Sequence, residues 1–221
     1  MRLRHIIVIA AVLGASETPA ETTSAPTASE PTPVPSERAG GKAWSFSASA
    51  STYCVPDDRT YLQPTVTADG GRLHLEARYN YESLSAVSAW IGWNFSMGEK
   101  VSLELTPMVG GVFGNTHGVA PGYKGSVGWW KLVLYSEGEY VFDTSTASDS
   151  FFYNWSELSL APVEWFRIGV VTQRTRAYKA ERELQRGLLV GVSYRGKDLS
   201  AFVFNPDNGK PLVIIAIAAT F

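Results

Sequence analysis

The sequence predicts an all-β fold, an antiparallel meander that closes into a transmembrane β-barrel of about ten to twelve strands, with twelve favoured. Three observations lead to this prediction: apolar and polar residues alternate with a period of two, the alternating segments are long, and aromatic residues gather near their ends. A tilted membrane-spanning strand needs about 9–11 residues, whereas strands in globular proteins are most often about 5–6 residues long. A soluble β-sandwich remains the alternative, because its strands also bury one face and expose the other to water.

The N-terminal part of the chain is predicted to lie outside this barrel. Residues 1–20 have a basic start, a short apolar run and then small residues, which is typical of a secretory signal peptide cleaved after Ala15 or Ala20. Residues 21–41 are rich in Pro, Ser and Thr and offer almost nothing to bury, so we expect a disordered segment in the periplasm. The barrel domain is therefore assigned to residues 42–221.

The composition narrows the possible functions. The 221 residues carry a formal charge of −2, so no basic surface for a nucleic-acid partner is expected. The single cysteine excludes a disulfide framework and a thiolate zinc cluster, and neither a metal nor a cofactor is expected. Aromatic residues make up 12% of the chain, and all of them lie from Trp44 onward.

Alternation is clearest between residues 72 and 82, where Leu73 and Leu75 alternate with His74 and Glu76. Eleven segments with this or a related pattern are predicted as strands: 42–54, 59–68, 72–82, 85–96, 100–110, 126–143, 151–161, 165–175, 188–195, 199–204 and 211–221. Single-chain bacterial barrels have an even number of strands. Either the stretch 111–125 contains one more strand, which makes twelve, or the weak segment 199–204 is not a strand, which makes ten.

Aromatic residues near the predicted strand ends are expected to form girdles at the two membrane interfaces. They are Trp44, Tyr53, Tyr61, Tyr79, Tyr81, Trp93, Phe95, Trp129, Trp130, Tyr140, Phe142, Phe151, Phe152, Tyr153, Trp155, Trp165 and Phe166.

The last predicted strand carries a recognisable ending. One of its faces holds Val213, Ile215, Ile217, Ala219 and the terminal Phe221. In this the chain resembles Gram-negative outer-membrane β-barrel proteins, whose final strand ends in an aromatic residue preceded by apolar residues at alternate positions. The resemblance implies an integral outer-membrane location, contact with outer-membrane lipid, and a barrel-assembly machinery that reads this C-terminal signal. It covers residues 44–221 in pattern, only 213–221 in motif, and says nothing about activity or oligomeric state.

The final strand departs from the usual pattern on its other face. Leu212, Ile214, Ala216 and Ala218 are apolar too, although they are expected to point inward. Local packing inside the lumen, or the seam between the first and last strands, would explain them.

If the apolar faces meet lipid, the polar faces line the lumen. The predicted inward residues are Arg72, His74, Glu76, Arg78, Asn80, Glu82, Lys100, Glu104, Lys131, Glu137, Glu139, Glu157, Arg167, Gln173, Gln185 and Arg195. Both signs occur in similar number, which predicts paired or hydrated charges in a narrow pore or a salt-bridged plug. The leading hypothesis is a small pore for passive transport of small hydrophilic solutes, and the alternative is that these groups only fill and hydrate the interior.

Two further hypotheses remain open. His74 and Glu76 share a face and could serve an outer-membrane lipid-modifying enzyme, but no catalytic residue is assigned because no serine lies in a recognisable motif. A structural or adhesive barrel that binds partners through its loops, around residues 114–124 and 144–150, is the third hypothesis.

Overall fold

The computed structural model describes residues 44–177, 183–207 and 209–221. The predicted signal peptide and the segment 21–41 lie outside these residues. The strands are β1 (Ser45–Cys54), β2 (Tyr61–Gly70), β3 (Leu73–Tyr79), β4 (Val87–Trp93), β5 (Phe95–Met97), β6 (Val101–Phe113), β7 (Gly118–Trp129), β8 (Leu132–Asp143), β9 (Phe151–Val163), β10 (Phe166–Ala177), β11 (Glu183–Tyr194), β12 (Lys197–Phe204) and β13 (Leu212–Thr220). A 3-10 turn, η1 (Ala147–Asp149), precedes β9. In the described part of the chain, no helix is long and apolar enough to cross a membrane.

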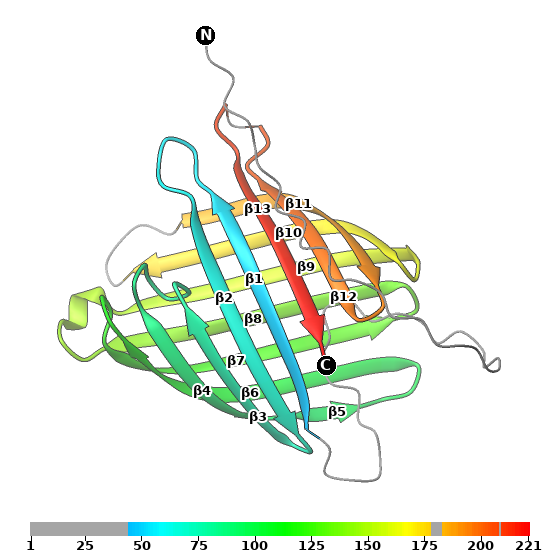
Figure 1. The fold of residues 1–221 in the computed structure, drawn as a ribbon, viewed down its shortest axis with the longest axis horizontal. Coiled ribbons are helices and arrows are strands. Elements are labelled where there is room, and N and C mark those ends of the chain that lie inside the picture. Colours follow the sequence, from blue (N-terminus) through cyan, green and yellow to red (C-terminus); the bar gives the residue numbers. More distant parts are fainter. Residues whose placement is uncertain (1–43, 178–182, 208) are drawn as a thin grey trace, which may run out of the picture.

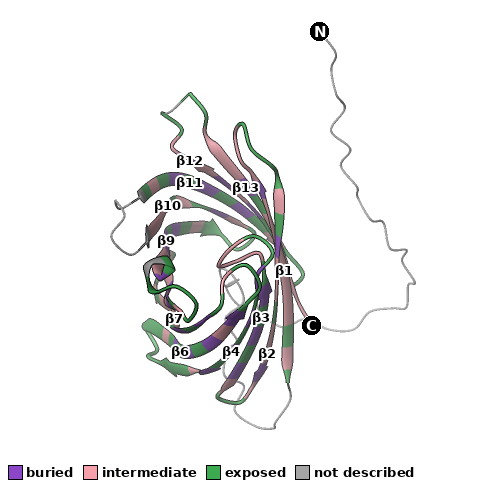
Figure 2. Cartoon of the chain, turned by 90° about the vertical axis from the view of Figure 1, so that its left-hand side faces the viewer, coloured by how far each residue is buried: buried purple, intermediate pink, exposed green. Residues whose placement is uncertain are grey.

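Twelve of these strands close into a single antiparallel ring. β1 closes it by pairing with β13, from Ser47 opposite Thr220 to Cys54 opposite Val213. Figure 1 shows β1, β2 and β13 crossing in front of β7, β8 and β9, as the near and far walls of a barrel with tilted strands do. Seen from the side, the strands curve into a closed ring (Figure 2). The predicted antiparallel barrel and the favoured number of twelve are confirmed.

β5 is not a separate member of this ring of twelve, because among the described strands it pairs with β6 alone. Its pairing of Phe95 with Leu105 continues the register in which β4 pairs Gly92 with Met108. β4 and β5 therefore behave as one strand that is interrupted at Asn94.

The strand missing from the sequence-based count is β7, which begins at Gly118 inside the stretch 111–125. The single strand predicted over 126–143 is wrong, since this segment holds the end of β7, a tight turn and β8. The turn contains Trp130 with a φ of 54° and no glycine or asparagine, so the sequence carries no turn signal there. The weak segment 199–204 is part of a real strand, β12.

The period of two decides which face of each strand is outside. On β3, the side chains of His74, Glu76 and Arg78 are buried inside the barrel, while Leu75 and Tyr79 are exposed outside. On β13, Ile214 is 1% exposed within the barrel, and its neighbour Ile215 is 45% exposed on the outer surface. The apolar outer surface is the one that a lipid environment requires of such a barrel.

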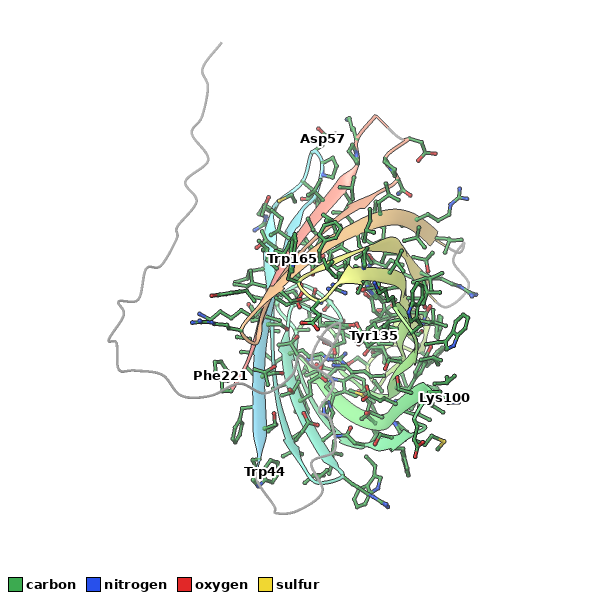
Figure 3. The ribbon with its side chains drawn as sticks, turned by 90° about the vertical axis from the view of Figure 1, so that its right-hand side faces the viewer. Trp44, Asp57, Lys100, Tyr135, Trp165 and Phe221 are labelled. Atoms are coloured by element: carbon green, nitrogen blue, oxygen red, sulfur yellow. The ribbon has the colours of Figure 1, made fainter. Side chains whose placement is uncertain are left out.

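Aromatic residues occupy the lumen as well as the outer rims. Figure 3 shows Trp44 and Phe221 outside the ring of strands and Tyr135 inside it, and Trp165 is exposed in a tight turn. The girdle prediction is wrong for the aromatic residues that line the interior, which are Tyr53, Tyr61, Tyr81, Tyr153 and Trp155. The Tyr81 hydroxyl donates to Glu137 and the Trp155 indole donates to Glu157 inside the barrel, and alternation alone does not separate an inward aromatic residue from an outward one.

The two ends of the barrel differ in their connections. One end, which we call the turn end, carries tight turns around residues 71–72, 98–100, 130–131, 164–165 and 195–196. The described chain also starts and stops there, because Phe46 and Phe221 exchange backbone hydrogen bonds of 3.3 and 2.8 Å. The opposite end, which we call the loop end, carries the longer connections, among them 55–60, 80–86 and 144–150.

A small polar group interrupts the outer surface on β7, β8 and β9. The side chain of Asn154 donates to the hydroxyl of Tyr123 (3.1 Å) and to that of Ser136 (3.2 Å), and Ser136 in turn lies 3.0 Å from the hydroxyl of Ser156. Because these groups satisfy one another, the desolvation cost of a polar group on this surface is reduced.

A tight contact between β4 and β6 makes a stability prediction. A Cβ atom at Gly110 would lie 2.4 Å from the indole of Trp90, and that ring is held by a 2.9 Å hydrogen bond to Ser88. We expect Gly110→Ala to lower the free energy of unfolding by about 1–3 kcal/mol, because the ring must shift in a packed interior. Denaturant unfolding in detergent measures the change. The matched control is Gly209→Ala, whose added Cβ has no atom within 4 Å, and equal effects of the two variants would contradict the prediction.

Candidate functional site

Small hydroxyl side chains form one wall of the lumen. They are Ser47, Ser49 and Ser51 on β1 with Thr65 and Thr67 on β2, and we call them the hydroxyl wall. Alternation sends all of them inward, and the hydroxyls of Ser47 and Thr67 lie 2.6 Å apart across the two strands. Small side chains on this wall leave free space in front of it.

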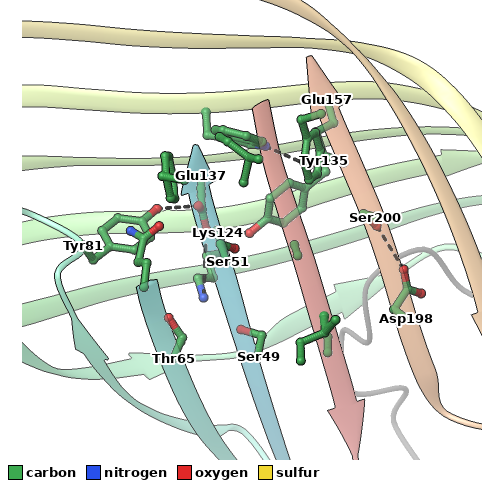
Figure 4. A pocket seen from close by; sticks show the side chains of 18 of the residues that line it. Ser49, Ser51, Thr65, Tyr81, Lys124, Tyr135, Glu137, Glu157, Asp198 and Ser200 are labelled. Carbon is green, nitrogen blue, oxygen red and sulfur yellow. Dashed lines mark hydrogen bonds and ion pairs between the residues drawn. The ribbon is translucent and has the colours of Figure 1, made fainter. Parts of the chain in front are cut away.

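Two cavities lie along the hydroxyl wall. The larger has a volume of about 190 Å³ and reaches Tyr53 and Gln63 toward the loop end; Figure 4 shows it from close by. The smaller has a volume of about 120 Å³ and reaches Asp69 toward the turn end. The two adjoin, because both are lined by Ser49 and Thr65. Together they extend through much of the lumen.

The smaller cavity contains an imidazole held between two carboxylates. Nδ1 of His74 lies 2.7 Å from Asp69, and Nε2 lies 3.0 Å from Glu76. Only a protonated ring carries an N–H on both nitrogens, so this geometry favours the imidazolium. Neither ring nitrogen is free to take a proton from a nucleophile, which argues against His74 as a general base.

Arg78 ties two sides of the barrel together. Its Nε donates to Glu76 on the same strand (2.5 Å), and its Nη1 donates to Glu139 on β8 (2.8 Å). A carboxylate oxygen of Glu82, in the β3–β4 loop, lies 3.7 Å from the same Nη1 of Arg78. Arg78 is 4% exposed, so these are buried charges whose desolvation is offset only while they remain paired.

The β3–β4 loop places an aromatic side chain against this arginine. The ring of Tyr81 lies 4.1 Å from the guanidinium carbon of Arg78, within the range of a cation–π contact. Its hydroxyl donates to Glu137, which also accepts a 2.7 Å hydrogen bond from Tyr135 (Figure 4). Burial and the neighbouring Glu137 carboxylate raise the pKa of the Tyr81 phenol well above its ordinary value, so the hydroxyl remains a donor.

Lys124 reaches from β7 toward β3. Its ammonium lies 2.5 Å from Glu76 and 4.0 Å from Glu137, and its side chain lines both cavities. It is therefore the cation at the junction between the two spaces.

A second ionic group lies on β9, β10 and β12. Arg167 donates to Ser200 (2.6 Å) and to Glu157 (3.2 Å), and it lies 3.5 Å from Asp198. Gly191 makes room for it, because a Cβ atom there would lie 2.6 Å from the Nε of Arg167.

Apolar side chains fill the part of the lumen beside the larger cavity. The buried members of this cluster are Tyr53, Trp155, Val171, Leu189, Phe202, Phe204 and Ile214. Leu212 and Ala216 pack against it from the inner face of β13. The apolar inner face of the last strand is thus explained by local packing inside the lumen, and the remaining passage is narrow.

Most of the predicted inward residues lie where alternation puts them. His74, Glu76, Arg78, Glu157 and Arg167 are buried in the barrel. Glu104 lines the smaller cavity and accepts a 3.1 Å hydrogen bond from Ser126. The others described on inward strand positions or in the β3–β4 loop are Asn80, Glu82, Glu137, Glu139, Gln173 and Gln185.

Four predicted inward residues lie elsewhere. Arg72, Lys100, Lys131 and Arg195 are exposed in the tight turns. Lys131, for example, donates to the backbone carbonyl of Pro162. All four are basic, so the expected balance of charges within the lumen is wrong. Side chains in a turn of two or three residues lie at the rim of the barrel and do not point into the lumen. The sequence alone does not show at which residue each strand ends and the turn begins.

The sequence-based set of inward residues lacks three charged groups. They are Asp69, Lys124 and Asp198, which line the two cavities. Asp69 and Asp198 stand beside glycine-bearing turns, and Lys124 lies in the stretch where β7 was not placed. A correct strand register would have found all three. Among the described residues, no group of three or more His, Cys, Asp or Glu is arranged to hold a metal ion.

Comparison with known proteins supports the fold. No protein-family model matches the chain, and no curated protein matches it either. Among solved structures, KdgM porin superposes with a TM-score of 0.53 at 8% identity, over 80% of this chain and 99% of that one. KdgM in complex with a disordered oligogalacturonate gives a TM-score of 0.53 at 7% identity and the same coverage. The outer membrane protein Omp33 of Acinetobacter baumannii gives 0.45 at 8% identity, over 80% and 97% of the two chains.

A closed ring of twelve strands with an apolar outside and a polar lumen defines a class: integral outer-membrane β-barrel proteins. Within it, the chain shares its fold with KdgM porin.

Proposed function

We propose that this protein is a narrow pore for the passive passage of small hydrophilic solutes across the outer membrane. The observation that carries the proposal is the pair of adjoining cavities along the hydroxyl wall, which extend from Asp69 near the turn end to Tyr53 near the loop end. Hydroxyl groups can exchange hydrogen bonds with water and with polar solutes, whereas the ion pairs opposite them keep the charged side chains in place.

The orientation follows the convention of bacterial barrels, in which short turns face the periplasm and long loops face outward. We propose that the turn end, and with it the N-terminal segment, lies on the periplasmic side. The terminal Phe221 would then be presented where a periplasmic assembly machinery can read it.

The solute bound in the KdgM complex, an oligogalacturonate, is a polyanion. Carboxylates outnumber the cationic groups around the two cavities, so we do not extend that ligand to this chain. The lipid-modifying hypothesis is not supported either, because both ring nitrogens of His74 already face carboxylates.

The test is conductance. We expect the purified, folded chain to produce discrete current steps of small amplitude in planar lipid bilayers. A sample unfolded by boiling is the control, and a gel shift on boiling verifies the folded barrel. A folded barrel that inserts into the bilayer and produces no steps would contradict the proposal.

A further inference from the structure

We infer that the lumen passes cations in preference to anions, so that its solutes are small cationic or neutral molecules. This inference rests on the proposed pore function and adds the charge class of the solute to it.

The charges around the cavities carry the inference. Six carboxylates line the two cavities: Asp69, Glu76, Glu104, Glu137, Glu157 and Asp198. The cationic groups that line them are Lys124, Arg167 and the His74 imidazolium. Arg78 does not line the cavities but pairs with Glu76 behind them, and it pairs with Glu139 as well. Even when Arg78 and a protonated His74 are both counted, six lining carboxylates face four cations, so the lumen carries an excess of negative charge.

Two of the carboxylates are oriented by hydroxyl donors. Glu137 accepts from Tyr81 and Tyr135, and the nearest ammonium lies 4.0 Å away. Glu104 accepts from Ser126, and within the described chain it forms no ion pair with a basic side chain. Hydroxyl donors stabilise the ionised form of a carboxylate without cancelling its charge.

The location of the basic residues points the same way. Arg72, Lys100, Lys131 and Arg195 are exposed in the turns and not in the lumen. Charges at an exposed rim are screened by salt over about 10 Å at 0.1 M ionic strength, whereas a narrow lumen with low-dielectric walls concentrates the field of the groups inside it. Acidic side chains inside a pore are a common basis of cation selectivity.

The test is the reversal potential of the open channel under a KCl gradient. We expect a potential of the sign that potassium permeation produces, and a permeability ratio of potassium to chloride of several-fold. Glu104→Gln is expected to lower this ratio, and Glu104→Lys to lower it further. The matched control is Glu99→Lys, which makes the same charge change at an exposed position in a tight turn and is expected to leave the ratio nearly unchanged.

The outcomes separate the inference from the pore itself. Channels that show equal permeability or prefer chloride would overturn the inference and leave the proposed function standing. A folded barrel without any conductance would overturn both. If Glu104→Lys fails to fold in the gel-shift assay, the reversal potentials of the unmodified chain and of Glu104→Gln still decide the question.

Discussion

Ser49→Trp is expected to remove most of the single-channel conductance. Ser49 projects from β1 at the point where the two cavities adjoin, and both cavities are lined by it. An indole is far bulkier than the serine side chain that it replaces, and it would occupy much of the space in a passage built around cavities of about 190 and 120 Å³. Planar-bilayer recording of the folded variant measures the loss.

The neighbouring position offers a matched control. Ala48 lies on the opposite face of β1, where it pairs with Ala219 on the outer surface of the seam. Ala48→Trp adds the same ring toward lipid and is expected to leave the conductance unchanged. Equal conductance in the two folded variants would show that solutes do not pass along the hydroxyl wall.

Arg78→Leu is expected to lower the free energy of unfolding of the barrel by about 3–5 kcal/mol. The substitution removes the cation between Glu76 and Glu139 and leaves their carboxylates buried without it. One oxygen of Glu139 already lacks a hydrogen-bond partner among the described residues. No other donor there is in place to take over from Arg78. Urea unfolding in detergent or lipid, followed by tryptophan fluorescence, measures the change.

Arg72→Leu removes the same charge from an exposed turn and serves as the control, with an expected change within about 0.5 kcal/mol. Replacing Glu139 by Gln together with Arg78→Leu should recover part of the loss, because one buried charge is then removed with its partner. If Arg78→Leu were no more costly than Arg72→Leu, the buried network would not stabilise the barrel.

Several features of the fold could be predicted because they depend on local chemistry. The alternation around His74, Glu76 and Arg78 predicts their inward positions, and a strand geometry of period two places them there. The requirement for an even number of strands pointed to a hidden strand in 111–125, and β7 begins in that stretch. By contrast, the turn at Trp130 and Lys131 had no glycine or asparagine to reveal it.

The candidate site could be predicted only in part. Arg167 and Glu157 were expected inside the barrel, but their approach to Ser200 depends on how β9, β10 and β12 are brought together by closure. Arg78 and Glu139 are 61 residues apart in the chain, and no local pattern links them. Tyr81 and Tyr135, the inward tyrosines that donate to Glu137, are placed along the sequence just as the tyrosines of an interfacial girdle are, so the sequence does not distinguish the two kinds.

The sequence by itself determined the class of fold and the two faces of most strands, because both follow from the local period of two and from the need to leave no strand edge unpaired in a membrane. It narrowed the number of strands to ten or twelve, and closure of the ring decided for twelve. Only the tertiary structure decided which charges share the lumen. Closure and register exclude Arg72, Lys100, Lys131 and Arg195 from the interior and bring Asp69, Lys124 and Asp198 into it. The reason is physical: where a strand ends depends on pairing with its neighbours, and one residue of register decides whether a charge lies in a lumen or at an exposed rim.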